Sequence, residues 1–402
     1  MKKFILVALL LIACTMVGAL ASCESSEYRE KIAGTYYAYF YSSNQGGYVV
    51  NKDNYITISP NGKCTYDLSY IAASNGLDPE GYKGKTTYKY NGKKFKLNIL
   101  LRDAVINDKV IRLGRWYFCQ ENSLPYETYD NVKYIRYDDD NYQVFGLVNN
   151  YVTSVNILTH YNGVKVTSFV ERAFTGSKLE NVTIPDTIVE IGDQVFENCS
   201  ELKNVTFMGE ITKIGLRTFK ECISLKDITI PDSVTAIGDN AFVGCESLKS
   251  IVIPNSVKKV GNALFFKCFN LESVTLPDSL TSIEGGMFLN CESLKSVNLP
   301  NGITEIGSGA FAGCKSLNNI TIPSSVTSIC SSAFSKCEEL KSIIIPNSIT
   351  SIGENAFGYC FDFEIYYQGN IAGWNDIAKA DNWNKEAVNY TIHCLDGYIV
   401  FE

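Results

Sequence analysis

One phenylalanine recurs at a fixed interval through the second half of the chain, and this interval limits the possible folds more than any other feature. Phe174 stands just ahead of the series and is one residue out of step, because the stretch that follows it is shorter than its counterparts. Every later member stands 23 positions after the one before: Phe196, Phe219, Phe242, Phe265, Phe288, Phe311, Phe334 and Phe357. A unit of this length cannot bury its own apolar face, so successive units must stack into a solenoid.

The unit from Val234 to Ser256 shows what each apolar position does. Leu248, Ile251 and Ile253 follow a Leu-x-x-Ile-x-Ile pattern, in which alternate strand residues point into the coil. Pro254 ends the strand because it lacks an N–H donor. A period between 20 and 29 residues with this spacing is the leucine-rich-repeat signature. The fold class predicted is mainly β, a leucine-rich-repeat solenoid with a parallel sheet and capped ends.

The wording I-P-x-S-V-T-x-I-G-x-x-A-F-x-x-C resembles the BspA-type leucine-rich repeats of bacterial surface proteins. The resemblance covers about residues 133 to 402 and implies a cap at 133–165, repeats at 166–364 and a second cap at 365–402. The resemblance extends to the second cap, where the matching residues are Trp374-Asn375 and His393-Cys394-Leu395-Asp396-Gly397. The same resemblance implies a non-enzymatic protein that acts in adhesion.

A cysteine stands three residues after each phenylalanine of the series. Equivalent residues of stacked turns lie about 5 Å apart at Cβ, beyond the roughly 3.5 to 4.5 Å of a disulfide, so we expect buried free thiols. Cys64 and Cys119 lie in expected strands of the N-terminal region and form a possible disulfide. The column consists of Cys199, Cys222, Cys245, Cys268, Cys291, Cys314, Cys337 and Cys360.

The residues between the inward strand positions are expected to line the concave face of the sheet. They are small, polar and nearly uncharged, which fits either a solvated face or a flat platform for a protein or glycan. Aromatic and arginine anchors are missing, so affinity would come from area or avidity. The candidate binding residues are Asn181, Thr183, Asn204, Thr206, Asp227, Thr229, Ser250, Ser273, Thr275, Ser296, Asn298, Asn319, Thr321 and Ser342.

The first 22 residues have the pattern of a signal peptide, with two lysines ahead of an apolar stretch. Leu20-Ala21-Ser22-Cys23 resembles the lipobox of bacterial lipoproteins, which implies acylation of Cys23 and a tether at residues 23–27. A second match ending at Cys14 would leave an unusually short signal, so Cys23 is preferred. Lipid chains would anchor the exported protein to a membrane, and the resemblance favours the outer membrane and the cell surface.

Residues 28–130 differ in character, being rich in tyrosine and in strand-turn-strand patterns. Hairpins are expected around Pro60-Asn61-Gly62 and Asn91-Gly92, and a third pairing would join 110–113 to 116–118. Several strands with short turns predict a small antiparallel barrel or sandwich. The Ile32-Ala33-Gly34-Thr35-Tyr36 opening resembles lipocalin-like lipoprotein domains, with Tyr where that family usually has Trp.

Charge and histidine content exclude several functions. A net charge of −7 gives no basic face for nucleic acid. With only His160 and His393 available, we expect no catalytic site, no metal and no cofactor. The leading hypothesis is a cell-surface lipoprotein that binds a protein or glycan through the repeats. The alternatives are a glycan-capturing accessory lipoprotein that binds through its N-terminal β domain, and a periplasmic envelope scaffold.

Overall fold

The computed structural model describes residues 34–42, 47–58, 63–67, 83–90, 95–97, 103–107, 110–113, 116–120, 126–137 and 140–401. The predicted signal peptide, Cys23 and the tether lie outside these residues. The chain divides into two compact units, Met1–Glu127 with Tyr134–Gln143, and Thr128–Lys133 with Val144–Glu402. Among the described residues, no helix has the length and apolar character needed to cross a membrane.

The N-terminal unit contains a closed antiparallel barrel of strands β1 to β8. The three expected hairpin pairings are confirmed, since β2 pairs with β3, β4 with β5, and β7 with β8. Of the two predicted alternatives, a barrel or a sandwich, the structure has the barrel. The strands are β1 Gly34–Ser42, β2 Gly47–Ile58, β3 Lys63–Asp67, β4 Lys83–Tyr90, β5 Phe95–Leu97, β6 Asp103–Asn107, β7 Val110–Leu113 and β8 Trp116–Gln120.

The possible disulfide between Cys64 and Cys119 joins strands that are not neighbours. Cys64 lies in β3 and Cys119 in β8, and the barrel order puts β1 and β2 between them. Neighbouring strands lie about 4.8 Å apart, so this order does not bring the two backbones side by side. Both side chains lie outside the described residues, and the disulfide stays a prediction.

A five-stranded sheet precedes the first repeat, in the order β13-β14-β11-β10-β9. Its core side chains include Tyr134, Val144 and Phe145, all buried. The ring of Phe169 at the end of β14 packs edge-on against Phe174, with centroids 5.6 Å apart, so the aromatic core of the repeats begins here. The strands are β9 Glu127–Tyr129, β10 Val132–Arg136, β11 Asn141–Leu147, β13 His160–Tyr161 and β14 Val164–Phe169.

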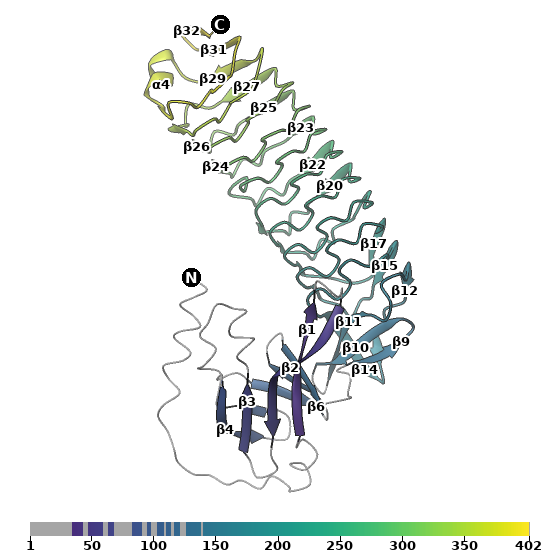
Figure 1. The fold of residues 1–402 in the computed structure, drawn as a ribbon. Helices are drawn as coiled ribbons and strands as arrows, with labels where there is room; N and C mark the ends of the chain where they lie inside the picture. The colour runs from purple at the N-terminus through teal and green to yellow at the C-terminus, as the bar shows by residue number, and fades with distance from the viewer. Residues whose placement is uncertain are drawn as a thin grey trace. The chain divides into compact units, whose positions relative to one another are not determined.

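The repeats form the predicted parallel ladder of strands, one strand to a turn (Figure 1). In the regular repeats each residue pairs with its equivalent in the next turn, 23 positions later, as Val182 does with Val205. The steps from Ser154 to Asn181, from Ser342 to Glu364 and from Glu364 to Thr391 depart from this period. The ladder is interrupted at Asp227–Thr229 and after β23, where Asp227 and Asn298 are poor strand formers. Its strands are β12 Ser154–Val155, β15 Asn181–Ile184, β17 Asn204–Phe207, β20 Ser250–Val252, β22 Ser273–Thr275, β23 Ser296–Val297, β25 Asn319–Thr321, β27 Ser342–Ile345, β29 Glu364–Tyr367 and β31 Tyr390–Cys394. The last strand of the sheet, β32 Gly397–Phe401, pairs antiparallel with β31.

A second, shorter parallel ladder runs along the solenoid, which the sequence analysis did not anticipate. It forms two four-stranded sheets, in which two residues of a turn pair with the next turn, as Ile214 does with Ile237. Its strands are β16 Glu190–Ile191, β18 Lys213–Ile214, β19 Ala236–Ile237, β21 Lys259–Val260, β24 Glu305–Ile306, β26 Ser328–Ile329, β28 Ser351–Ile352 and β30 Ala378–Lys379. A short helix, α4 (Ile371–Asp376), buries Trp374 in the C-terminal turn.

The phenylalanine column is the spine of the core, as predicted. From Phe196 to Phe357 the rings are fully buried and stack nearly parallel, with neighbouring centroids 5.2 to 5.8 Å apart. The backbone adopts left-handed φ two residues before and two residues after each of these rings, so that the chain turns sharply on both sides of it. The non-glycine members are Gln194, Asn198, Arg217, Glu221, Asn240, Ala263, Lys267, Asn290, Ser332, Lys336, Asn355 and Tyr359.

Replacing Ala263 by glycine should stabilise the solenoid. Ala263 has φ 52°, a conformation that costs an L-residue roughly 1 to 2 kcal/mol and costs glycine little. Glycine also has more chain entropy in the unfolded state, which offsets part of this gain. The free energy of unfolding, measured in urea, should therefore rise by about 0.5 to 1 kcal/mol. The matched control is Ala312→Gly, at a position without positive φ, which should lose stability. Equal losses in both variants would contradict this account.

Candidate binding face of the repeats

The alternate residues of the long ladder point outward, as the sequence predicts. All fourteen candidate residues are exposed except Ser342, which is half-buried, whereas the residues between them, such as Val205, Ile251 and Ile320, are buried. Equivalent side chains are one turn apart, and the amide of Asn204 donates to the Oδ1 atom of Asn181 at 2.7 Å. We call this surface the strand face; it comprises the outward residues from Asn181 to Ser342.

A column of mainly basic residues borders the strand face, just before each strand. Lys203 pairs with Glu180 at 2.8 Å and Lys295 with Glu272 at 2.7 Å. The column also contains Lys226, Lys249 and Lys341, all exposed. These residues give the almost uncharged strand face a positive margin. The sequence analysis did not predict this margin, although its lysines recur at one position of the repeat. The hydrogen bond from Lys295, followed by its charge, lowers the pKa of Glu272.

The strand face continues into the C-terminal turn, where aromatic residues replace threonine. Ile344 pairs with Tyr366, Tyr366 with His393, and His393 with Tyr398, so these residues form one outward row. The Tyr366 and His393 rings stack with centroids 4.8 Å apart. The Tyr366 hydroxyl donates to Glu364, which raises the pKa of Tyr366. The aromatic anchors that the threonine columns lack are therefore present at one end.

The cysteine column lies in the core as free thiols, as predicted. Each thiol donates to a carbonyl oxygen of an earlier turn, as Cys245 does to Phe219 at 3.2 Å and Cys291 to Phe265 at 3.1 Å. Burial raises the pKa of every thiol in the column, that of Cys199 to about 11. Buried, protonated thiols are poor nucleophiles, so this column is a packing feature.

The column should therefore resist thiol reagents in the folded protein. We expect the eight buried thiols to react with an aromatic disulfide reagent only as fast as the solenoid opens, and at once in urea. The half-buried Cys330 and Cys394 supply the internal control for slow but measurable labelling. Mass spectrometry of labelled peptides distinguishes the two groups. Fast native labelling at Cys268 would show that the column is accessible.

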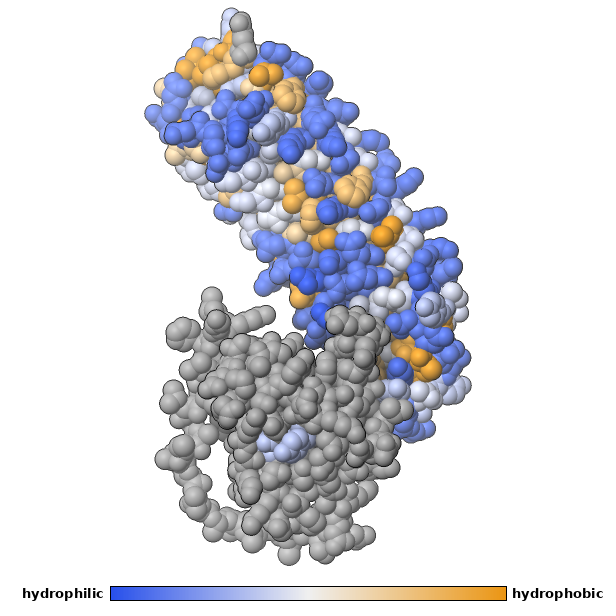
Figure 2. Space-filling view, viewed as in Figure 1, coloured by the Kyte–Doolittle hydropathy of each residue, from blue (hydrophilic) through white to orange (hydrophobic). Residues whose placement is uncertain are grey.

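The two histidines lie on different strands, with His160 exposed in β13 and His393 half-buried in β31. The Nε2 atom of His393 lies 3.8 Å from Glu364 Oε2. Within the described part of the chain, no three His, Cys, Asp or Glu side chains gather as metal ligands. What the described solenoid offers is a long polar face with a basic margin and an aromatic end. Figure 2 shows polar residues over most of the solenoid, with apolar patches at its C-terminal end, in its middle and near its first turns.

Turns of constant length, two parallel ladders and a buried phenylalanine spine define a leucine-rich-repeat solenoid. The chain belongs to the BspA-type leucine-rich-repeat family, whose repeat model matches in six copies over residues 167–294 and 258–372. The predicted family is thus confirmed. Among curated proteins, none matches the chain.

Solved structures of bacterial leucine-rich-repeat proteins are similar to this chain. A protein from Bacteroides ovatus is 26% identical, covers 66% of this chain and 90% of its own, and has a TM-score of 0.46. One from T. pallidum is 30% identical over 46% of this chain and 88% of its own, with a TM-score of 0.43. A leucine-rich cell surface protein from Faecalibacterium prausnitzii is 27% identical over 64% and 98%, with a TM-score of 0.29.

Proposed function

We propose that this protein is a non-enzymatic, exported lipoprotein, anchored in the outer membrane through Cys23, which binds a protein or glycan on the strand face. The observation that carries the proposal is the strand face itself. It is a row of outward residues, most of them Asn, Thr or Ser, that recurs turn after turn with a basic margin. An extended, shallow surface of this kind suits a long partner contacted at many weak points.

The family supports the binding role, because stacked repeats bury one side of each unit and leave an extended outward surface for contact. The lipobox at Cys23 supports the anchor. A partner with negative groups, such as an acidic glycoprotein, suits the lysines at Lys226, Lys249 and Lys341. Adhesion then follows from many such faces on one cell, since avidity multiplies weak contacts.

Glutamate substitutions on the strand face should abolish binding without unfolding the protein. Thr229 and Thr275 are exposed, so Thr229→Glu with Thr275→Glu should change the free energy of unfolding by less than about 0.5 kcal/mol each. Two carboxylates would cancel the charges of Lys226 and Lys249 and remove their attraction for an acidic partner. Urea unfolding measures the first expectation.

The binding test uses cells displaying the full chain on plates coated with mucin, or with a matrix protein such as collagen. Wild-type cells should be retained on one of these coatings, and the double Glu variant should lose most of that retention. The control is Thr212→Glu with Thr235→Glu, exposed threonines of the same stretch of the solenoid that lie off the strand face. Retention by both variants equal to that of the wild type would refute the strand face as the binding surface.

A further inference from the structure

Strand β32 leaves one edge of the long ladder open. It ends the sheet β25-β27-β29-β31-β32 and, among the described residues, pairs only with β31. The N–H and C=O groups of its outer edge therefore present a template for another strand. Proteins usually protect such an edge with charged residues, proline or a bulge, but β32 reads Gly-Tyr-Ile-Val-Phe.

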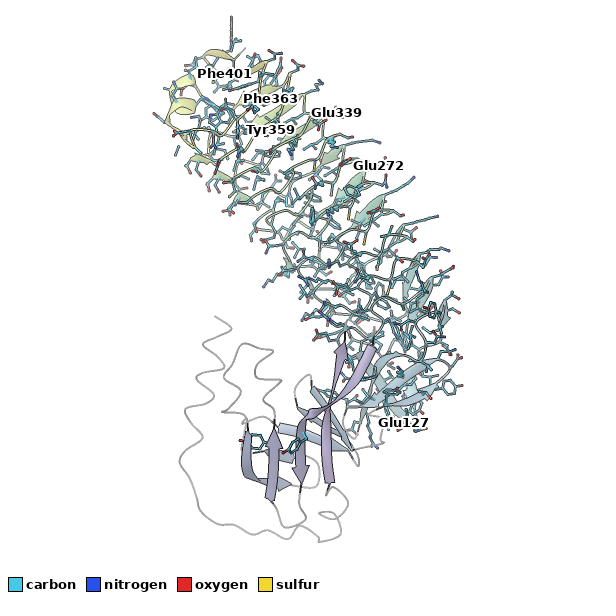
Figure 3. The ribbon with its side chains drawn as sticks, in the orientation of Figure 1. Glu127, Glu272, Glu339, Tyr359, Phe363 and Phe401 are labelled. Atoms are coloured by element: carbon cyan, nitrogen blue, oxygen red, sulfur yellow. The ribbon has the colours of Figure 1, made fainter. Side chains whose placement is uncertain are left out.

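The side chains of β32 are also left uncovered on both faces of the sheet. On the strand face, Tyr398 is 69% exposed and Val400 54%. On the core side, Phe401 stacks on Tyr390 with centroids 4.5 Å apart, yet it is 36% exposed. Figure 3 shows Phe401 at the end of the solenoid, beyond Phe363. A terminal cap normally has a polar outer face, so this apolar edge can accept one more strand.

The inward residues of the preceding strands show what a further strand would supply. Ile343, Ile365 and Ile392 occupy the same inward row and are fully buried, because each has a strand on both sides. The next member of the row, Ile399, is half-buried, because only β31 flanks it. The missing neighbour must be an extended segment with apolar side chains alternating on both faces.

We propose that the outer edge of β32 pairs antiparallel with β32 of a second copy of this chain. A two-fold axis normal to the sheet keeps each face on its own side. The strand faces of the two copies then form one continuous surface, and their cores adjoin. With the axis at Val400, the two Val400 residues face each other and Ile399 lies opposite Phe401 of the second copy. In this register Ile399, Val400 and Phe401 of each copy face described residues of the other, and none of the three is charged, so no like charges are opposed there.

The area available makes this a weak, reversible dimer. Three described residues a side, Ile399 to Phe401, are far below the roughly 20 to 30 residues a side of a stable interface. Confinement of the chains to a surface would raise their local concentration and favour pairing. The inference goes beyond the proposed function, since end-to-end pairing would join two strand faces into one continuous surface.

Sedimentation velocity of the purified full chain with an untagged C-terminus tests the pairing, over about 1 to 100 µM, the range where weak interfaces form. The wild type should shift from monomer to dimer, and Val400→Lys should remain monomeric because two ammonium groups would oppose each other. Val252→Lys is the matched control: Val252 is also an outward valine of the ladder, 61% exposed, and its variant should dimerise like the wild type.

A second measurement reads the register directly. Under mild oxidation, Val400→Cys should give a disulfide-linked dimer, whereas Val252→Cys should not. A wild type that stays monomeric over the whole range, or a Val400→Lys variant that dimerises like the wild type, would overturn the proposal. Loss of dimer in Val252→Lys with retention in Val400→Lys would assign association to the middle of the strand face and would also overturn it.

Discussion

Raising the pH from 8 to 10 should remove roughly 10 kcal/mol from the free energy of unfolding, because eight buried thiols cannot ionise in the native state. The ordinary pKa of cysteine is 9.0, and burial raises the native pKa of each column member, that of Cys199 least, to about 11. At pH 10 most thiols of the unfolded chain have released their protons and the native thiols retain them, a difference of roughly 1 to 1.5 kcal/mol per thiol.

The sign follows from the direction of the shift. A raised native pKa gives stability that is fully present below pH 9.0 and is lost as the pH rises toward the native pKa. A loss of roughly 10 kcal/mol is comparable with the total stability of a folded domain, so the solenoid should unfold near pH 10. Urea titrations at steps of pH between 7 and 10 measure the slope.

Removing thiols supplies the control for this prediction. Cys268→Ala with Cys291→Ala should be less stable than the wild type at pH 7, because two small cavities are made. It should nevertheless lose roughly 2 to 3 kcal/mol less between pH 8 and 10, because two titrating groups are gone. Stability that stays flat to pH 10 in the wild type would mean that the thiols ionise in place or are not free.

Replacing Phe265 by alanine should cost about 3 to 5 kcal/mol, the largest effect expected of a single substitution at neutral pH. Its ring is fully buried between Phe242, at 5.8 Å, and Phe288, at 5.7 Å, so its removal leaves a cavity in the middle of the spine. The rigid repeats on both sides cannot collapse into that space without breaking their ladders.

The neighbouring residue provides the comparison. Phe266 is only half-buried, with the Nζ atom of Lys267 5.1 Å from its ring centroid, so Phe266→Ala should cost less than about 1.5 kcal/mol. Urea unfolding of the two variants compares the same chemical change one residue apart. Similar losses for both would show that burial in the spine is not what stabilises the repeats.

The spacing of apolar residues was enough to predict the repeats, their inward rows and their outward rows. Phe242, Ile251 and Cys245 each have an equivalent one repeat later, and a fixed period leaves one arrangement in which all such residues are buried together. Thr229 and Thr275 are outward for the same reason. Whether a residue of a repeat points inward or outward can therefore be predicted from its position alone.

Three features could not be predicted, each for a different physical reason. The second ladder uses only two residues per turn, such as Lys213–Ile214, too few to show alternation. The left-handed positions hold residues as unlike as Ala263 and Tyr359, because the coil and not the residue imposes the conformation. The aromatic end was hidden because the step from Ser342 to Glu364 is shorter than the period and the step from Glu364 to Thr391 is longer.

Protease shaving of intact cells carrying the full chain tests most directly whether the protein is an anchored surface binder. Wild type and Cys23→Ser are fractionated, treated with protease from outside, and blotted for the repeats. The account predicts that the wild type is bound to the membrane and cleaved, and that Cys23→Ser leaves the membrane. A wild type that is bound to the membrane but protected would contradict surface binding and favour a scaffold inside the envelope.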